Sequence, residues 1–413
     1  MTRIDPKLRR QILLIILVAG MGYFVDIYDL ILFLFVKKSS LAELNIPETE
    51  YRSLLNYQMV GMLLGGIVWG ILGDKKGRLS TLFFTILIYS LANIANGFVQ
   101  DLEQYRILRF IAGFGLAGEL GIGITLVSEI MSKESRGYGT AIVAGIGIAG
   151  AALGYFVTHY YGWRMAFWTG GGLGLALLVL RVSIHESTMF AAAKKSELKR
   201  GNFLELFTSR AKLKKYLFCI LIGVPVWYVI GIIIAGSEKF ALNVFHIDGT
   251  EGVKDIGAKS VFYHYIGASI GSFITGFMSQ WLRSRKKALI LSLIGLVVIL
   301  AAFFCSYGVS LSTYYFVIFL LGIVQGYWAI FVTISSEQFG TNLRATVATS
   351  VPNIVRGATV LMTLSYASLG TAEEGSTKGA IIVGAVVMAL AFWAAFSLKE
   401  TYGKELDYLE PAE

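Results

Sequence analysis

Two aspartates inside the first long apolar segment are the residues with the clearest chemical potential. Asp26 and Asp29 lie within residues 11–36, where nearly all other side chains are apolar or small. A carboxylate at the centre of a membrane-spanning helix costs roughly 2.5 kcal/mol or more, so it usually marks a path for protons, ions or substrate. Their spacing of three residues predicts one shared helix face. A buried pair neutralised by a basic partner on a neighbouring helix is the structural alternative.

Three further charged residues, Arg109, Glu119 and Arg356, also lie inside apolar segments. Loss of hydration raises the proton affinity of a carboxylate, whereas a nearby cation lowers it. A carboxylate that alternates between two such environments takes up and releases a proton during a cycle. We therefore expect Asp26 and Glu119 to carry the proton. A simple pair between Glu119 and Arg109 is disfavoured, because ten residues along one helix separate them too widely for contact.

Arg356 has no acidic residue at comparable depth in the second half of the chain. A guanidinium binds carboxylate or phosphate with two parallel hydrogen bonds, so Arg356 is the expected anchor for an anionic substrate. Pairing with Asp26 or Glu119 across a cavity is the alternative. Other polar or aromatic side chains that could line such a cavity, or serve only as helix contacts or interfacial anchors, are Asn56, Tyr57, Gln58, Trp227, Tyr228, His264, Gln325, Tyr327, Trp328 and Asn353.

The composition explains why these charges must be membrane-embedded. The chain has 413 residues, of which 55% are hydrophobic and 15% charged, and its mean hydropathy is +0.66. These values indicate an all-α polytopic membrane protein. Its two cysteines, Cys219 and Cys305, both lie in apolar segments, so we expect neither a disulfide framework nor a metal site. Because no nucleotide-binding loop, catalytic triad or metal-ligand spacing is present, we expect no enzyme and no cofactor.

Apolar stretches of about 20 residues recur along the chain and predict twelve membrane-spanning helices. Pro225 predicts a kink in the seventh. The expected spans are residues 12–36, 53–73, 80–99, 105–130, 138–160, 164–184, 216–240, 258–282, 288–307, 312–336, 344–369 and 376–398.

Most of the 36 Lys and Arg residues fall in alternate loops and in the two terminal segments. The positive-inside rule then places both termini in the cytoplasm. This distribution accounts for the net charge of +9 without a nucleic-acid partner. We expect a monomer in a bacterial inner membrane.

A short internal repeat divides the chain. Residues 128–136 and 336–344 both read Ser-Glu, six residues, then Arg. We expect two six-helix halves, residues 1–184 and 216–413, joined by a basic cytoplasmic linker over residues 185–215. Two parallel repeats around a midplane site are a common plan of secondary transporters.

Several motifs carry a family resemblance that covers almost the whole chain. The loop Gly73-Asp74-Lys75-Lys76-Gly77-Arg78 resembles the signature between helices 2 and 3 of the major facilitator superfamily. Residues 108–121 are similar to the Arg-x-x-x-Gly and Gly-Gly-Glu-x-Gly patterns of its metabolite:proton symporters, with Ala117 in place of the first glycine of the second pattern. Residues 24–30 resemble the Asp-Gly-Tyr-Asp-Leu segment of its aromatic-acid symporters, with Ile27 in place of glycine.

This resemblance implies roles for the remaining charges. In the superfamily fold, spans 1 and 4 lie close together, so Arg109 is expected to neutralise Asp29 as a structural or coupling partner. A set of cytoplasmic charges is expected to lock the halves together when the cavity faces outward, although static anchoring is an alternative. These residues are Asp74, Arg78, Glu129, Arg136, Glu337 and Arg344.

The combined prediction is a proton-coupled importer of a small organic anion that works by alternating access. One alternative is an exporter that holds a cationic metabolite or drug with Asp26 and Asp29. A membrane receptor that binds a ligand without transporting it is an alternative from another class.

Overall fold

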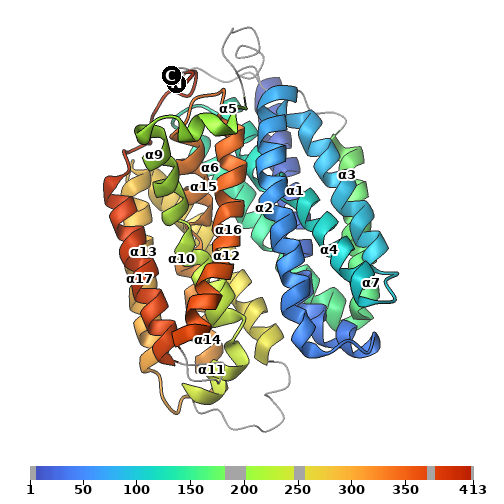
Figure 1. Cartoon of the computed structure of the whole chain (residues 1–413). Helices are drawn as coiled ribbons and strands as arrows, with labels where there is room; N and C mark the ends of the chain where they lie inside the picture. Colours follow the sequence, from blue (N-terminus) through green and yellow to red (C-terminus); the bar gives the residue numbers. More distant parts are fainter. Residues whose placement is uncertain (1–5, 182–200, 246–255, 370–376, 411–413) are drawn as a thin grey trace.

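The computed structural model describes residues 6–181, 201–245, 256–369 and 377–410, and these residues form helices and turns without a strand (Figure 1). The first group of helices is α1 (Pro6–Glu43), α2 (Tyr51–Lys76), α3 (Arg78–Asn96), α4 (Leu102–Leu116), α5 (Glu119–Ile130), α6 (Arg136–Ile148) and α7 (Gly150–Arg181). The second group is α9 (Arg210–Leu221), α10 (Val224–Tyr228), α11 (Ser237–Asn243), α12 (Ile256–Trp281), α13 (Arg285–Cys305), α14 (Leu311–Gln325), α15 (Trp328–Glu337), α16 (Arg344–Leu369) and α17 (Thr377–Ser397).

The helices supply the twelve crossings that hydropathy predicts. Nine stretches of the described residues are long and apolar enough to span a membrane. One of them, Arg136–Leu180, has 45 residues, which is too long for one crossing, and it turns at Gly162, where φ is +80°. Helices α12 and α16 are less apolar, but each has 26 residues and is long enough to cross. The prediction of an all-α membrane protein is confirmed.

The predicted helix boundaries agree closely with the structure, and the bounds of α16 match the predicted span. Pro225 lies in the first turn of α10 and is followed by a π-helical segment, Val229–Ile234, so the seventh span is irregular as expected. Three breaks were not predicted. They separate α4 from α5 at residues 117–118, α6 from α7 at residue 149, and α14 from α15 at residues 326–327.

Helix α16 of the second group packs closely on α2 and α5 of the first, and small residues make this approach possible. A Cβ on Gly121 would lie 2.4 Å from the carbonyl oxygen of Ala348, and one on Gly70 would lie 2.8 Å from the Cα of Thr346. Any larger residue at these two positions would push α16 away. Close packing therefore fixes the height and rotation of α16, which carries Arg356.

The turn between α2 and α3 marks one end of the bundle, hereafter the α2–α3 end. The turns before α6, α13 and α16 and the segment after α17 lie at the same end (Figure 1). Of the predicted linker, residues 185–200 lie outside the described part of the chain. Helix α9 already begins at Arg210, within the range assigned to the linker.

Candidate functional site

The Arg356 side chain lies at the centre of the bundle and is almost completely buried, with 1% exposure. Its Nη1 atom donates a hydrogen bond to Oδ1 of Asn353 at 2.9 Å. Its Nε atom has no hydrogen-bond acceptor among the described residues. The rings of Trp227 and Trp328 lie 6.0 and 5.8 Å from the guanidinium carbon. This arginine therefore combines an unused donor with two aromatic neighbours.

Asp26 of α1 approaches this arginine from the first group of helices. Its buried carboxylate lies within electrostatic range of Arg356 and of Glu119. Neither carboxylate oxygen accepts a hydrogen bond from a described residue. Tyr23, one helical turn earlier, contacts Trp328 and also lies within electrostatic range of Arg356. The predicted proton carrier and the predicted substrate anchor thus face one another.

Glu119 is the first residue of α5 and is buried. The break before it leaves the carbonyl oxygen of Ala117 without an intrahelical donor, and Nδ2 of Asn353 donates to that oxygen at 2.9 Å. Because Asn353 also accepts from Arg356, one amide connects the arginine to the α4–α5 break. Three charges from α1, α5 and α16 therefore meet in one cluster, which we call the central site.

Asp29 does not share the surroundings of Asp26. Three residues turn a helix by about 300°, which leaves the two side chains roughly 60° apart. Asp29 packs against Gly170 of α7 and is approached by the amide of Asn93, inside the first group of helices. The two side chains thus stay on one face of α1, and Asp29 points into the first helix group.

Arg109 is buried beside Asp29 but forms no ion pair of 4 Å or less with it in the described structure. Its guanidinium carbon lies 5.5 Å from the ring centroids of both Phe33 and Phe167. The two charges remain within electrostatic range of each other. Their interaction lies inside the first helix group and does not reach Arg356 directly.

Three further candidates use their polar atoms within the second helix group. The His264 Nε2 atom lies 2.6 Å from Oε1 of Gln325, and Nε2 of Gln325 donates to the carbonyl oxygen of Val226 at 3.2 Å. The hydroxyl of Tyr228 donates to the carbonyl oxygen of Ala380 at 2.7 Å. These side chains join neighbouring helices, so the structure gives them a packing role.

Two of the three candidates on α2, Tyr57 and Gln58, contact residues of the first helix group. Tyr57 is 41% exposed, and its ring lies 5.8 Å from the guanidinium carbon of Arg106. Gln58 is fully buried and packs against Gly113 of α4, and its amide atoms have no hydrogen-bond partner among the described residues. Of the predicted lining residues, Trp227, Trp328 and Asn353 therefore lie next to Arg356.

Glu129 is the centre of a charged cluster at the α2–α3 end. Its Oε1 atom accepts from Nη2 of Arg78 at 2.9 Å and from Nη1 of Arg344 at 3.0 Å. All three side chains are buried, so each charge depends on the others for neutralisation. Arg78 belongs to the first helix group and Arg344 to the second, so this cluster joins the two groups.

Asp74 adds a second connection beside this cluster. Its carboxylate accepts from the backbone N–H groups of Ala345 at 3.1 Å and Thr346 at 2.8 Å, and from the Thr346 hydroxyl at 2.7 Å. It also lies 3.3 Å from Nη1 of Arg78. A carboxylate of α2 therefore caps the start of α16, whose first N–H groups have no intrahelical partner.

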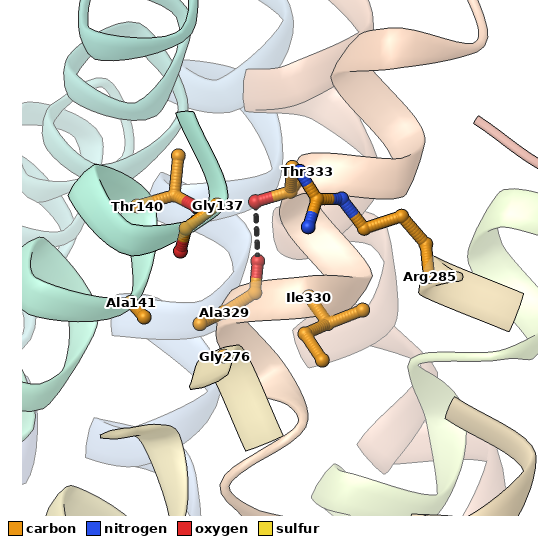
Figure 2. A pocket seen from close by; sticks show the side chains of 8 residues that line it. All are labelled: Gly137, Thr140, Ala141, Gly276, Arg285, Ala329, Ile330 and Thr333. Carbon is orange, nitrogen blue, oxygen red and sulfur yellow. Dashed lines mark hydrogen bonds between the residues drawn. The ribbon is translucent and has the colours of Figure 1, made fainter. Parts of the chain in front are cut away.

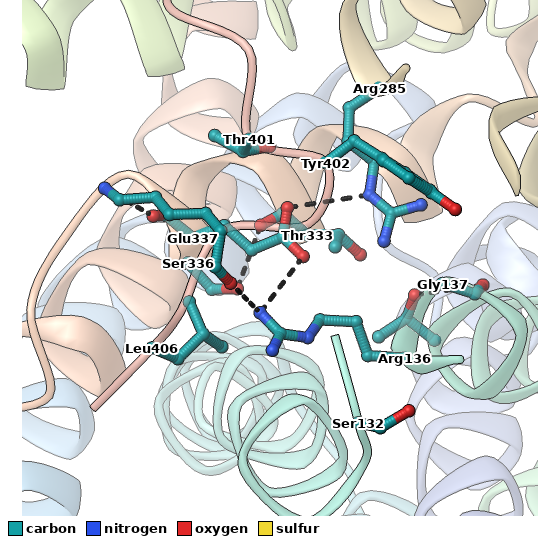
Figure 3. A network of polar contacts seen from close by, with 12 residues as sticks. Ser132, Arg136, Gly137, Arg285, Thr333, Ser336, Glu337, Thr401, Tyr402 and Leu406 are labelled. Carbon is teal, nitrogen blue, oxygen red and sulfur yellow. Dashed lines mark hydrogen bonds and ion pairs between the residues drawn. The ribbon is translucent and has the colours of Figure 1, made fainter. Parts of the chain in front are cut away.

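Glu337 is the centre of an equivalent cluster (Figure 3). Its carboxylate lies 3.5 Å from Nε of Arg285 and 3.7 Å from Nη1 of Arg136. As with Glu129, one arginine comes from the same helix group and the other from the opposite group. Nη1 of Arg285 donates to Oγ of Ser279 at 2.7 Å, so Ser279 takes the place that Asp74 has beside Arg78.

Sequence reasoning did not identify Arg285, Tyr23 or Tyr265 as site residues. Arg285 lies in the basic loop 281–287, which corresponds to the loop that contains Arg78, and this correspondence was the available signal. Tyr265 lies within electrostatic range of Tyr23 and Arg356. Nothing in the local sequence distinguishes these tyrosines from other aromatic residues in the spans.

The opposite end of the bundle has a weaker connection. There Lys38 and Glu238 form an ion pair of 2.9 Å between the two groups, and their side chains are 55% and 37% exposed. Exposed pairs contribute little, typically about 0–1 kcal/mol. In the described part of the chain, the buried charged contacts between the groups are thus concentrated at the α2–α3 end.

A narrow gap lies beside Arg285, between the two helix groups, and it has no room for a molecule of substrate size (Figure 2). It is lined by Gly137, Thr140, Ala141, Gly276, Arg285, Ala329, Ile330 and Thr333.

Comparison with known proteins gives a consistent result. Residues 12–362 match the family model of the Major Facilitator Superfamily. The niacin transporter NiaP of Acinetobacter baylyi is 24% identical, with 94% of each chain covered. The cis,cis-muconate transport protein of the same organism is 26% identical, covering 95% of this chain and 94% of that protein.

A probable 4-methylmuconolactone transporter of Cupriavidus pinatubonensis is 25% identical and covers 95% of this chain and 91% of its own. The solved structure of the proton:xylose symporter XylE has the same fold, with a TM-score of 0.77 at 14% identity, covering 97% of this chain and 98% of that chain. With a family model matched over most of its length and the same arrangement of helices, this integral membrane protein belongs to the Major Facilitator Superfamily.

Proposed function

We propose that the protein imports a small organic carboxylate together with protons by alternating access. The observation that carries this proposal is the buried Arg356 guanidinium, which keeps an unused donor and lies beside two indole rings opposite Asp26. Burying a cation costs free energy unless an anion binds close to it and neutralises its charge. A substrate carboxylate would supply that anion.

The substrate that suits this site best carries a flat unsaturated group next to its carboxylate. Trp227 and Trp328 present ring faces near the guanidinium, and stacked aromatic contacts contribute about 0.5–1.5 kcal/mol beyond simple burial. Niacin and cis,cis-muconate, which are named as the cargo of two relatives, are carboxylates with conjugated π systems. Chemistry and similarity thus support the same substrate class.

Proton coupling follows from charge balance at the central site. Asp26 and a substrate carboxylate would compete for the one cation, Arg356, in surroundings of low dielectric constant. Two carboxylates cannot both stay ionised beside a single guanidinium without a large penalty. We therefore infer that Asp26, with Glu119 as its neighbour, takes up a proton when substrate binds. Asp29 and Arg109 would hold α1 and α4 in register.

The charged clusters at the α2–α3 end are proposed as the cytoplasmic gate. In this assignment both termini lie in the cytoplasm of a bacterial cell, residues 1–184 and 216–413 rock against each other, and a single chain suffices for transport. The buried contacts of Asp74, Glu129 and Glu337 would hold the cytoplasmic side closed. Opening toward the cytoplasm would require all of them to separate.

Replacing Asp74 with alanine tests the gate. The variant loses three hydrogen bonds to the start of α16. Interhelical hydrogen bonds in membranes contribute about 0.6 kcal/mol each, so the ratio of closed to open state should fall roughly twentyfold. The measurement is the distance between spin labels attached to each helix group at this end. Lys75→Ala, an exposed neighbour, is the matched control. Unchanged distances in the Asp74 variant would remove it from the gate.

The substrate class is tested by ligand-dependent thermal stability of the purified protein. An aromatic or dienoic carboxylate should raise the melting temperature of the protein, and the corresponding amine should not. Only the anion can bind the Arg356 guanidinium and neutralise its charge. The competing function is export of a cation bound by Asp26. Neither carboxylate oxygen of Asp26 has a hydrogen-bond partner among the described residues, so both are able to bind a cation. Stabilisation by the amine alone would favour that exporter.

A further inference from the structure

The segment after α17 forms an ordered tail across the α2–α3 end of the molecule (Figure 1). Residues 398–410, hereafter the C-terminal tail, contain no helix or strand. Leu406 and Thr401 are nevertheless only 1% exposed, and Glu410 is 8% exposed. A tail that merely followed the last helix would have no reason to be buried.

The end of the tail is anchored on the second helix group. The Asn342 amide accepts from the backbone N–H of Glu410 at 2.8 Å and donates to the Glu410 carbonyl oxygen at 3.1 Å. The Glu410 carboxylate accepts from Nζ of Lys215 at 2.9 Å. The N–H of Thr341 donates to the carbonyl oxygen of Tyr408 at 2.9 Å. Three contacts therefore tie this part of the tail to the turn before α16, and a fourth ties it to α9.

The beginning of the tail is held at the start of α13. The Glu400 carboxylate accepts from the Ser284 hydroxyl and from the N–H groups of Arg285 at 2.9 Å and Lys286 at 3.2 Å. Burial raises the pKa of Glu400, but these hydrogen bonds outweigh it and leave the pKa below its usual value. The carboxylate stays ionised and keeps the first turn of the tail in place.

The middle of the tail reaches the first helix group. Nη1 of Arg136 donates to the carbonyl oxygen of Lys404 at 3.1 Å. Lys133, in the turn before α6, forms an ion pair with Glu405. Both contacts join the two helix groups, and neither would survive a separation of the groups at this end.

The same stretch of tail also binds the arginines of the two charged clusters. The Leu406 carbonyl oxygen accepts from Nη2 of Arg344 and from the Thr341 hydroxyl at 3.0 Å. The Tyr402 ring lies 5.4 Å from the guanidinium carbon of Arg285 (Figure 3). Nζ of Lys404 donates to the carbonyl oxygen of Glu337 at 3.3 Å. The tail therefore supplies carbonyl acceptors to Arg136 and Arg344, the two arginines that cross between the groups.

We propose that the C-terminal tail is a latch of the cytoplasmic gate. It stays anchored to the second half and holds the first half through Lys404 and Glu405, which stabilises the inward-closed state. The inference rests on the proposed alternating access and adds a component to it. Loss of the Arg136–Lys404 hydrogen bond, at the usual strength of interhelical hydrogen bonds, corresponds to a population shift of about threefold, and the exposed Lys133–Glu405 pair adds a smaller amount.

Distances between the halves test the latch without any substrate. With spin labels at exposed Lys76 and Lys287, removal of residues 403–413 should raise the inward-open population about threefold or more. Lys133→Glu should produce a smaller shift in the same direction, and Lys133→Glu with Glu405→Lys should reverse it. Lys399→Ala, an exposed position on the same tail, is the control and should have no effect. Identical distance distributions for all variants would overturn the proposal.

Cross-linking gives the complementary test in protein with Cys219 and Cys305 replaced by serine. Joining Lys133→Cys to Glu405→Cys with a short reducible reagent should trap the closed state and lower uptake more than tenfold. Reducing the cross-link should restore uptake. Joining Lys286→Cys to Lys399→Cys links the tail within one half and should leave uptake intact, and the reagent should not change the uptake of the single-cysteine variants. Normal uptake by the 133–405 cross-linked protein would disprove the latch. The distance measurement is made without substrate, so it can support the latch even if the proposed substrate is wrong. Failure of the latch and failure of the substrate assignment are therefore distinguishable.

Discussion

Replacing Arg356 with lysine is expected to weaken binding of a carboxylate substrate about 10- to 100-fold. Lysine keeps the charge but loses the planar pair of donors, and a hydrogen bond to a charged group is worth about 1.5–3 kcal/mol. The reason is visible in the structure, where the guanidinium is oriented by Asn353 and flanked by two indole rings. The measurement is the dissociation constant in detergent, together with the melting temperature without ligand.

Arg164→Lys is the matched control for that variant. Arg164 binds Glu43 and the carbonyl oxygen of Gly97 at the end of the bundle opposite the α2–α3 turn, so its substitution should leave substrate affinity unchanged. An Arg356 variant that binds substrate like the unmodified protein would eliminate this residue as the anchor. A variant with a much lower melting temperature would instead indicate a structural role.

Neutralising Asp26 and Glu119 together, as Asp26→Asn with Glu119→Gln, is expected to abolish accumulation of substrate against its gradient. Both carboxylates are buried near Arg356, and without them no group at the central site can carry a proton. Exchange of labelled for unlabelled substrate should continue, because Arg356 and the gate are intact. The measurement compares concentrative uptake with exchange in reconstituted vesicles.

The single variants separate the two carboxylates. Asp26→Asn alone should cause most of the loss, since Asp26 competes with substrate for the Arg356 charge. Asp29→Asn should lower protein stability more than coupling, because Asp29 packs among α3 and α7 inside the first helix group. Full accumulation by the double variant would contradict the proposed proton path.

The fold could be predicted from the sequence because membrane burial imposes a simple rule. A backbone in lipid must satisfy its own hydrogen bonds, so a run of about 20 apolar residues is necessarily helical. Even Pro225 had its expected effect on the seventh span. The breaks at residues 117–118 and 326–327 could not be predicted, since they depend on partners from other helices, such as the Asn353 amide at Ala117.

The site could be predicted in part. A charge in a span is conspicuous, which is why Asp26, Glu119 and Arg356 were found from their positions alone. Asp29 was assigned to Arg109 rather than to the proton on the basis of the family resemblance. Tyr23 and Arg285 acquire their significance only from neighbours distant in sequence. The tail was missed because its contacts join residues distant in sequence, and several of them run through backbone groups that leave no trace in residue type.

The most direct test of the central claim is the pH inside reconstituted vesicles when carboxylate substrate is added outside, with no pH gradient imposed. Proton-coupled entry predicts that the lumen of wild-type vesicles acidifies as labelled substrate enters, and that vesicles with Asp26→Asn and Glu119→Gln show no acidification. Substrate entry without any pH change, or with the same acidification in the double variant, would contradict the account.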